Sequence, residues 1–414
     1  MLGDLGRSPR MLNHAQSLAA HGWEVDLIGY AGAALPAGIR GCPHIRVHAL
    51  SDTTPPSALR STSRVLYLWR AGARAAGLGW RLARLLVREV GRPALILVQN
   101  PPGIPTLPMA WFAARLRSAS LVVDWHNLTY AMLALRLGTG HALVAFAAAV
   151  ERAIGRRADR NLFVSQTMAD HLRERWGLTG VVFRDRPGTA FRPLDATSRA
   201  TIRAGILARV GARGDERESL IVVSPTSWTA DEDFDLLLDA ARHMETLVQP
   251  LSPVTSPQRR ILVLASGRGA LRERFERQLA TLALRAITVS TIWMEPDEYP
   301  SLVAAADVGL CLHRSASGMD LPMKVMDFFG AAVPVCALNY GPCLAEAVRD
   351  GDNGLTFTDA PQLARLLVEL AGSGFARLEH LRAGAAASGA VAWDRAWAQE
   401  VLPTLPVTAT GGDG

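Results

Sequence analysis

The sequence predicts an α/β protein made of two doubly wound parallel-sheet domains in tandem, and one repeated pattern carries this prediction. Short apolar runs rich in β-branched residues alternate with helical patterns, and after a break the alternation begins again. The runs lie at 23–30, 94–100, 120–127 and 161–165, and then at 219–227, 260–267, 286–293, 307–313 and 333–338. Such alternation indicates parallel strands joined by crossover helices. A length of 414 residues is enough for two domains with separate cores.

The domain boundaries follow from the stretches that lack this pattern. Residues 184–219 contain "RPGTAFRPLD" and then an Arg-, Gly- and Glu-rich stretch without a clear period, which is typical of a hinge followed by a surface loop. A Pro- and Ser-rich stretch at 246–260 predicts a second loop. The expected organisation is an N-terminal domain at 1–190, a linker and surface loop at 191–218, a second domain at 219–385, a C-terminal helical segment at 386–405 and a disordered tail at 406–414.

The beginning of the chain predicts an incomplete first strand. "MLGDLGRSPR" has the composition of a strand end followed by its loop, so we expect the first strand of the N-terminal domain to be cut short. No run of about 18 apolar residues is present, so no membrane span is encoded in these residues. The four cysteines form no CxxC pair, which indicates reduced core residues.

The positive charge is concentrated in the N-terminal quarter. The chain has a net charge of +6, yet residues 1–100 alone contain 12 arginines and 5 acidic residues. This quarter could therefore meet an anionic membrane or a phosphorylated substrate. With 49% hydrophobic and 20% charged residues, the whole chain has the composition of a folded globular protein.

Ligands of doubly wound folds bind at the carboxyl ends of the parallel strands, so candidate site residues should come from the loops that follow strands. The first such loop is "GDLGRSPR" at 3–10. Gly6 belongs to a tight turn that opens a helix, whose N-terminus favours an anion, and Arg7 and Arg10 add positive charge. The alternative is an ordinary strand-to-helix turn with solvated arginines.

A second candidate is "VVDWHNLTY" at 122–130. Alternation along a strand places Asp124 and His126 on one face, where a carboxylate could steady the imidazole. An imidazole of this kind can accept a proton from a hydroxyl near neutral pH. The alternative is a hydrogen-bonded histidine at a strand terminus.

The third candidate is "SPTSWTADEDFDLLL" at 224–238. Its acidic triplet, Asp231 to Asp233, resembles the DxD motif of metal-dependent glycosyltransferases. Thr229 and Glu232, however, have the spacing of a capping box, and acids in a first helical turn offset the helix dipole. We therefore interpret the carboxylates as structural and keep Ser227 and Trp228 as binding candidates.

The fourth candidate lies at 313–335 and contains Lys324, the only lysine in the chain. The small residues Ser315, Ser317 and Gly318 could cradle a phosphate through backbone N–H groups. Lys324 falls near the start of the following helix, and Asp327 lies three residues on, on the same face. The alternative is an exposed ion pair between these two residues, but such a pair would tolerate arginine, which this chain uses everywhere else.

A basic amphipathic helix is predicted at 64–88, with Arg70, Arg74, Trp80 and Arg81 among its residues. Arginines gathered on one face and flanked by tryptophans are typical of interfacial membrane binding. The alternative is a helix that packs its apolar side on the sheet and leaves the arginines solvated.

Several of these stretches together resemble one known family. "LGDLGRSPRMLNHAQSLAAHG", "LVQNPPGIP", "VVDWHN", "SPTSWTADEDFDLLLDA", "SGRGALRE" and "SGMDLPMKVMDFFGAAVPVCALNY" resemble, in the same order, the eukaryotic chitobiosyldiphosphodolichol β-mannosyltransferases. The similarity runs from about residue 2 to residue 403. "FRP" at 191–193 is similar to the F-x-P of the interdomain linker in the GT-B glycosyltransferases, and "PMKVMDFF" is similar to their donor-binding motif.

The resemblance implies a GT-B fold, in which two Rossmann-like domains face one another across a cleft. It implies an inverting transfer of mannose from GDP-mannose to GlcNAc2-diphospho-dolichol without a metal cofactor. Lys324 and the loop with Ser315, Ser317 and Gly318 would then meet the donor diphosphate, and Asp327 the ribose. Gly6, Arg7 and Arg10 would meet the acceptor diphosphate, with His126 as the first choice of catalytic base and Asp4 as the second.

The resemblance also implies a location at the cytosolic face of the endoplasmic reticulum membrane. The family carries an N-terminal membrane anchor and a complete first strand, both of which the sequence predicts to be missing from this chain. The implied partners are the lipid-linked acceptor, the membrane surface and other mannosyltransferases of the pathway, with no nucleic acid. Two rivals stay open: a GT-B transferase with another sugar nucleotide or polyprenyl acceptor, and an inactive scaffold subunit.

Overall fold

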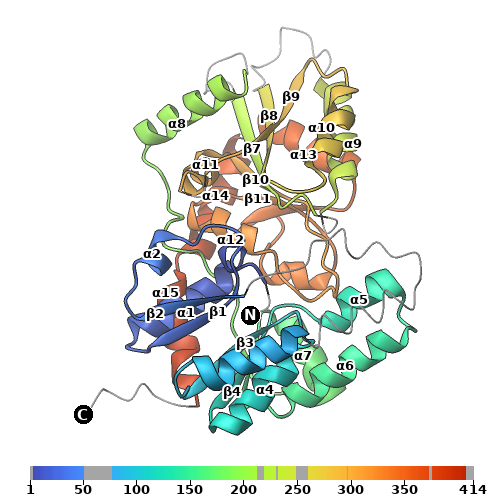
Figure 1. Ribbon diagram of the computed structural model, residues 1–414. Coiled ribbons are helices and arrows are strands. Elements are labelled where there is room, and N and C mark those ends of the chain that lie inside the picture. Colours follow the sequence, from blue (N-terminus) through green and yellow to red (C-terminus); the bar gives the residue numbers. More distant parts are fainter. Residues whose placement is uncertain are drawn as a thin grey trace. The chain divides into compact units, whose positions relative to one another are not determined.

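The computed structural model describes residues 3–50, 77–211, 219–229, 232–248, 260–295, 297–372 and 375–406. The chain divides into two compact units (Figure 1). Unit 1 consists of Met1–Arg184 and Asp394–Gly414, and unit 2 of Asp185–Trp393. The division therefore falls after Arg184 and Trp393 rather than at 190 and 385, and the last helix returns to unit 1 instead of forming a segment of its own.

The described part of unit 1 contains two parallel sheets. Its strands are β1 (Val25–Tyr30), β2 (Ile45–Leu50), β3 (Leu95–Asn100), β4 (Ser120–Trp125), β5 (Arg160–Phe163) and β6 (Val181–Val182). β1 pairs with β2, while the second sheet has the order β3-β4-β5-β6. The helices are α1 (Pro9–Ala20), α2 (Ala37–Arg40), residues 77–84 continuing into η3 (Leu85–Glu89), α4 (Thr106–Arg117), α5 (Thr129–Leu137), α6 (Ala142–Gly155), α7 (Gln166–Trp176) and α15 (Trp393–Glu400), with short turns η1 (Leu5–Arg7) and η6 (Leu402–Thr404).

The expected short first strand is represented by a single bridge. Asp4 pairs in parallel with Tyr30 at the end of β1, and Tyr30 N–H donates to Gly3 O at 2.9 Å. β1 and β3 are not hydrogen-bonded to each other among the described residues, and a cavity of about 340 Å³ is lined by both strands and by α1.

Unit 2 is built on one six-stranded parallel sheet with the order β12-β11-β10-β7-β8-β9. Its strands are β7 (Ser219–Pro225), β8 (Arg260–Ser266), β9 (Ile287–Ile292), β10 (Val308–Cys311), β11 (Val335–Leu338) and β12 (Gly354–Phe357). The helices are α8 (Ala196–Arg209), α9 (Phe234–Val248), α10 (Arg272–Ala280), α11 (Tyr299–Ala305), α12 (Met323–Gly330), α13 (Ala360–Ala371) and α14 (Phe375–Gly389), with the turn η5 (Pro342–Glu346).

Helices cover both faces of this sheet, which explains the continuous apolar runs of its strands. Along β7, Leu220 and Val222 pack into the cluster formed with α9, α10 and α13. The alternate residues Ile221 and Val223 pack into the cluster formed with α8, α11 and α12. Successive side chains of a strand point to opposite faces, so every residue of β7 is buried.

The predicted two-domain α/β fold is confirmed, and all nine predicted strands are present. β2, β6 and β12 were not predicted.

The structure corrects the linker at 191–218, because residues 196–209 form α8 within unit 2. Asp195 caps this helix through Ser198 N–H at 2.8 Å, and Ile206 and Leu207 are buried. The arginines and the glycine of α8 interrupt its apolar repeat, so the sequence pattern did not indicate a helix there. The predicted loop at 246–260 begins inside α9, while 249–259 and 407–414 lie outside the described residues.

Candidate active site

The strand order of unit 2 places a ligand crevice next to β7. In chain order the sheet runs outward from β7 through β8 and β9 on one side, and from β10 through β11 and β12 on the other. The order of connection thus reverses between β7 and β10. In doubly wound sheets ligands bind at the carboxyl ends of the strands at this switch point.

Lys324 lies at this position and is held by a buried carboxylate. Its Nζ donates to Glu232 Oε1 at 2.5 Å, and the side chains are 29% and 4% exposed. The other oxygen, Glu232 Oε2, accepts from Thr226 Oγ1 at 2.5 Å and from Ser227 N–H at 3.1 Å. The ammonium has three N–H donors, and in the part of the chain that the structure describes Glu232 Oε1 accepts one of them, so Lys324 is fixed in place with donors left for an anion.

The loops after β7 and β10 are joined to each other around this pair. Asp233 N–H donates to Leu312 O at 3.1 Å, and Glu232 forms an antiparallel bridge with His313. Arg314 makes two hydrogen bonds to Asp233 Oδ2, at 2.6 and 3.0 Å. Two segments far apart in the chain therefore form one support for Lys324.

The loop after β8 packs so closely on the same segment that it requires glycine. A Cβ on Gly267 would lie 1.8 Å from Thr226 O, and one on Gly269 would lie 2.1 Å from Ser227 O. Gly267 also has a φ of +156°. A side chain at either position would push the Thr226–Ser227 backbone away from Glu232, so these glycines position the site indirectly.

The structure corrects the interpretation of the acidic triplet. Asp233, and not the predicted pair Thr229 and Glu232, caps α9, because its Oδ1 accepts from Leu236 N–H at 3.0 Å. Glu232 instead binds Lys324. Asp231 lies outside the described residues. Sequence reasoning thus missed Glu232 as a site residue.

Trp228 is not available to a ligand, contrary to the prediction. Its φ of +54° turns the indole into the core, where it is fully buried. It stacks on Phe234 at a centroid distance of 4.6 Å and also contacts Phe275. The neighbouring Ser227 is exposed, and its contact with a ligand stays a prediction.

The predicted phosphate loop at 315–318 is organised around a buried carboxylate that was not predicted, Asp320. Ser315 and Ser317 both donate through their hydroxyls to Asp320 Oδ1, and His313 Nε2 lies 2.9 Å from Oδ2. Gly318 N–H donates to Ser315 Oγ at 2.8 Å. This N–H is therefore engaged within the loop, and the expected cradle would need the loop to change its hydrogen bonds before it could hold a phosphate through Gly318.

Asp327 lies on α12 with Lys324, as the spacing predicts, but the two do not pair. Tyr299 Oη donates to Asp327 Oδ2 at 3.2 Å. The pKa of Asp327 is raised to about 7, chiefly by burial and also by the nearby Asp185 carboxylate, while the Tyr299 hydroxyl and Lys324 oppose the rise. Near neutral pH this carboxyl can thus either accept or donate a hydrogen bond.

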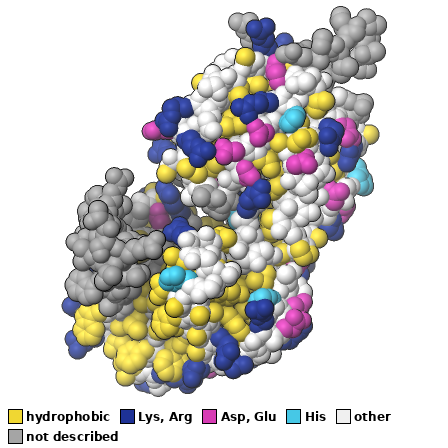
Figure 2. Space-filling model, turned by 90° about the vertical axis from the view of Figure 1, so that its right-hand side faces the viewer, with side chains coloured by type: hydrophobic (Ala, Val, Ile, Leu, Met, Phe, Trp, Pro, Cys, Tyr) yellow, Lys and Arg dark blue, Asp and Glu magenta, His cyan; other side chains and the backbone are white. Residues whose placement is uncertain are grey.

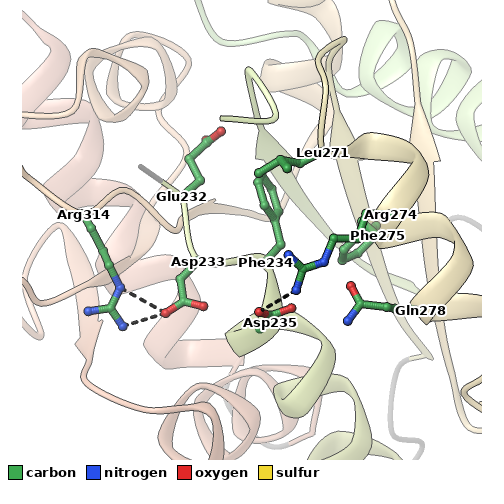
Figure 3. A pocket seen from close by; sticks show the side chains of 9 residues that line it. All are labelled: Glu232, Asp233, Phe234, Asp235, Leu271, Arg274, Phe275, Gln278 and Arg314. Carbon is green, nitrogen blue, oxygen red and sulfur yellow. Dashed lines mark hydrogen bonds and ion pairs between the residues drawn. The ribbon is translucent and has the colours of Figure 1, made fainter. Parts of the chain in front are cut away.

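A polar pocket of about 290 Å³ lies beside Glu232, between the start of α9 and α10 (Figure 3). Its charged side chains face one another in pairs, Asp233 with Arg314 and Asp235 with Arg274. Of the site residues described above, it contains Glu232, Asp233 and Arg314. At the carboxyl ends of β8 and β9, Arg268 stacks over the Trp293 ring at 4.0 Å, a pair that sequence reasoning did not identify.

In unit 1 the structure overturns the prediction that Arg10 meets an acceptor phosphate. The guanidinium is buried and forms two hydrogen bonds with Asp124, both at 2.8 Å, and a third with Phe183 O at 3.0 Å. His14 Nε2 lies 3.5 Å from the same carboxylate. Burial alone would raise the pKa of Asp124, but Arg10 and His14 hold that pKa well below its usual range. Arg10 and Asp124 are therefore structural.

The remaining residues of the first loop differ in exposure. Arg7 is 67% exposed, with its Nε 3.5 Å from Asp4 Oδ2. Asp4 accepts from Gly6 N–H at 3.1 Å and from Ala33 N–H at 3.0 Å, so it holds the loop in shape. A Cβ on Gly6 would lie 2.6 Å from Ala33 O, which explains the glycine. Asp4 thus has a structural function that the prediction of a second-choice base did not include.

His126 follows β4 and is half-buried, and its backbone N–H donates to Asn100 O at 2.9 Å. The expectation that Asp124 steadies its imidazole is wrong, because that carboxylate is bound by Arg10 and His14.

Of the predicted membrane helix, Trp80 and Arg81 are exposed, while Arg70 and Arg74 lie outside the described residues. Within the described ranges, no helix combines the length and the apolar character needed to cross a bilayer.

Comparisons with known proteins agree with the predicted fold and family. Residues 6–184 match the family model of the glycosyl transferase 4-like domain. The human chitobiosyldiphosphodolichol β-mannosyltransferase is 35% identical, over 98% of this chain and 91% of its own length. The Pongo abelii protein of the same name is 36% identical over the same shares. An Arabidopsis thaliana relative named UDP-glycosyltransferase TURAN is 34% identical, over 98% of this chain and 96% of its own length.

Two solved structures show the fold. The Anabaena protein HepE in complex with UDP and glucose aligns with a TM-score of 0.67 at 15% identity, covering 98% of this chain and 99% of its own. The glycosyltransferase WaaG aligns with a TM-score of 0.58 at 15% identity, covering 96% of this chain and 94% of its own. Both likenesses support the GT-B fold of two Rossmann-like domains that the sequence resemblance predicts. The chain belongs to the chitobiosyldiphosphodolichol β-mannosyltransferase family.

Proposed function

We propose that this protein transfers mannose from GDP-mannose to GlcNAc2-diphospho-dolichol with inversion, forming a β1,4 link. The observation that carries the proposal is the position of Lys324, a fixed and part-exposed ammonium at the switch point of a doubly wound sheet. The names of the relatives supply the acceptor and the mannosyl group. The donor GDP-mannose is our own addition to what those names state.

In the proposed reaction the acceptor hydroxyl attacks the anomeric carbon of mannose as the bond to GDP breaks. A base takes the hydroxyl proton, and GDP leaves with the electron pair of the broken bond. Positive charge placed where negative charge develops lowers the barrier, and this is the role of Lys324 at the diphosphate. The exposed Ser227 and the loop with Ser315, Ser317 and Gly318 would complete the donor site, and Asp327 would accept from ribose hydroxyls.

The test is transfer of radiolabelled mannose to a chitobiosyl-diphospho-lipid, with UDP-sugars as competitors. We expect GDP-mannose to be used and UDP-sugars to be ignored, and we expect EDTA to leave the rate unchanged because no metal is required. Turnover of a UDP-sugar without turnover of GDP-mannose would establish the rival transferase, which the name of the Arabidopsis relative makes a concrete alternative. Failure to bind GDP in calorimetry would instead favour the inactive scaffold subunit.

His126 is our first choice for the base, so the His126→Ala variant should lose activity. We expect kcat to fall by roughly 10²-fold or more, the range typical of general base catalysis, with little change in KM for the donor. A matched control is His44→Ala, which removes an exposed imidazole of unit 1 that pairs with Glu24. A wild-type rate in His126→Ala with purified lipid acceptor would remove His126 as the base and leave Asp4.

We further propose that the reaction takes place at the cytosolic face of the endoplasmic reticulum membrane, where other mannosyltransferases of the pathway would be neighbours. The exposed Arg7 is the residue of the first loop that could still meet the acceptor diphosphate. Trp80 and Arg81 support contact of unit 1 with the membrane surface. No nucleic acid partner is proposed.

A further inference from the structure

The hairpin of α5 and α6 in unit 1 exposes large apolar side chains that no part of the proposed reaction uses. We define the hairpin patch as Met132, Leu135, Leu137, Leu143 and Phe146, which are 43%, 72%, 42%, 40% and 56% exposed. Scattered exposed apolar residues are ordinary, but these five lie within 15 residues of chain, on two helices that pack against each other. Figure 2 turns this side toward the viewer and shows hydrophobic side chains gathered in one area, with Lys and Arg side chains around it.

The inner side of the hairpin is fixed, so the exposed outer face is not a loosely packed core. Glu151 of α6 is fully buried and accepts from Thr129 N–H at 2.7 Å and Tyr130 N–H at 3.2 Å at the start of α5. Asn100 Nδ2 also donates to it at 2.7 Å. Burial raises the pKa of Glu151, and these donors oppose the rise. The hairpin therefore presents its patch on a rigid support.

The exposed charges on α4, α5 and α6 have one sign. The helices α4, α5 and α6 are described throughout, and their only acidic residue is the buried Glu151. Arg136 lies between Leu135 and Leu137 and is exposed, as are Arg115 on α4 and Arg152 on α6. Arginine side chains among exposed apolar ones suit a surface whose edge is anionic and whose interior is apolar.

We propose that the hairpin patch inserts into the interfacial layer of an anionic bilayer, with Arg136 at the level of the lipid headgroups. A second copy of this chain fits less well, because a two-fold contact through this face would bring like-charged arginines together without acidic partners. The site differs from the predicted basic helix at 64–88. The inference rests on the proposed function only for the use of membrane binding, which is to bring the enzyme to a lipid-borne acceptor.

The test is flotation of the full chain with vesicles of phosphatidylcholine, with or without phosphatidylserine, in the absence of donor. The wild type should float with the anionic vesicles, and Leu135→Asp/Phe146→Asp should bind at least ten times more weakly. Arg136→Glu should weaken binding to the anionic vesicles by several-fold and leave binding to neutral vesicles unchanged. Both variants replace exposed side chains, so their melting temperatures should match that of the wild type.

Matched controls come from unit 2. Leu247→Asp on α9 changes an apolar residue that is 43% exposed, and Arg365→Glu on α13 reverses an exposed charge, so both should bind vesicles like the wild type. Wild-type binding by Leu135→Asp/Phe146→Asp would overturn the proposal. The proposal would also be overturned if the wild type were a dimer and this variant dissociated the dimer without any loss of vesicle binding. If vesicles are bound but mannose is never transferred to a detergent-solubilised acceptor, the proposed function fails and the inference stands.

Discussion

Replacement of Lys324 by arginine should reduce kcat/KM for the sugar donor by about 10- to 100-fold, although the charge is kept. The ammonium lies 2.5 Å from Glu232 Oε1, and that carboxylate is itself held by Thr226 and Ser227. A planar guanidinium is larger and binds carboxylates through two parallel bonds, so it would displace the positive charge from the place where the leaving group develops its own charge. Initial rates with GDP-mannose and the lipid acceptor measure the effect.

Removal of the charge needs a second change, because Lys324→Met alone would leave Glu232 buried and unpaired. The double variant Lys324→Met/Glu232→Gln keeps the site neutral, and we expect it to fold with a melting temperature near that of the wild type. Its kcat/KM should fall by about 10³-fold, since preorganised donors at developing charge have effects of this size. Arg365→Met is the control for loss of a surface charge in the same unit. Near-normal turnover in the double variant would make the ion pair purely structural.

The sequence predicted those parts of the fold and site that depend on local pattern. Apolar runs identified the nine strands because burial on both faces leaves few polar residues in β7 or β8. Lys324 was found because it is the only lysine of the chain, and its position at the start of a helix follows from the preceding proline. The order of the strands then placed it at the switch point.

The errors concern contacts between residues far apart in the chain. Glu232 fitted a local capping pattern, and its true partner is 92 residues away. Arg10 fitted an anion site at the start of a helix, and its carboxylate is 114 residues away. Trp228 was expected to face a ligand because of its place ahead of a helix, but a single positive φ turns its ring into the core. None of these contacts has a signal in the spacing of neighbouring residues.

The buried pair of Arg10 and Asp124 should be among the most sensitive positions for the stability of unit 1. Arg10→Met leaves the fully buried Asp124 without its arginine and with only the weaker His14 contact in the described part of the chain, and breaking a buried ion pair typically costs about 3–5 kcal/mol of the free energy of unfolding. Arg10→Met/Asp124→Leu removes both charges and should recover most of this loss, since apolar replacement of a whole buried pair is often neutral. Urea unfolding followed by tryptophan fluorescence measures both values.

The pH dependence of stability and the matched variant Arg7→Met separate the structural role of Arg10 from a role in phosphate binding. Because the folded pKa of Asp124 is depressed, its contribution is present above the unfolded pKa of about 4 and is lost as the pH falls below it. The double variant should therefore lose less stability than the wild type on acidification. Arg7→Met removes an exposed arginine from the same loop and should change stability by less than about 1 kcal/mol while weakening use of the lipid acceptor. If Arg10→Met were as stable as Arg7→Met, the structural role of Arg10 would be contradicted, and Arg10 would return as a candidate phosphate ligand.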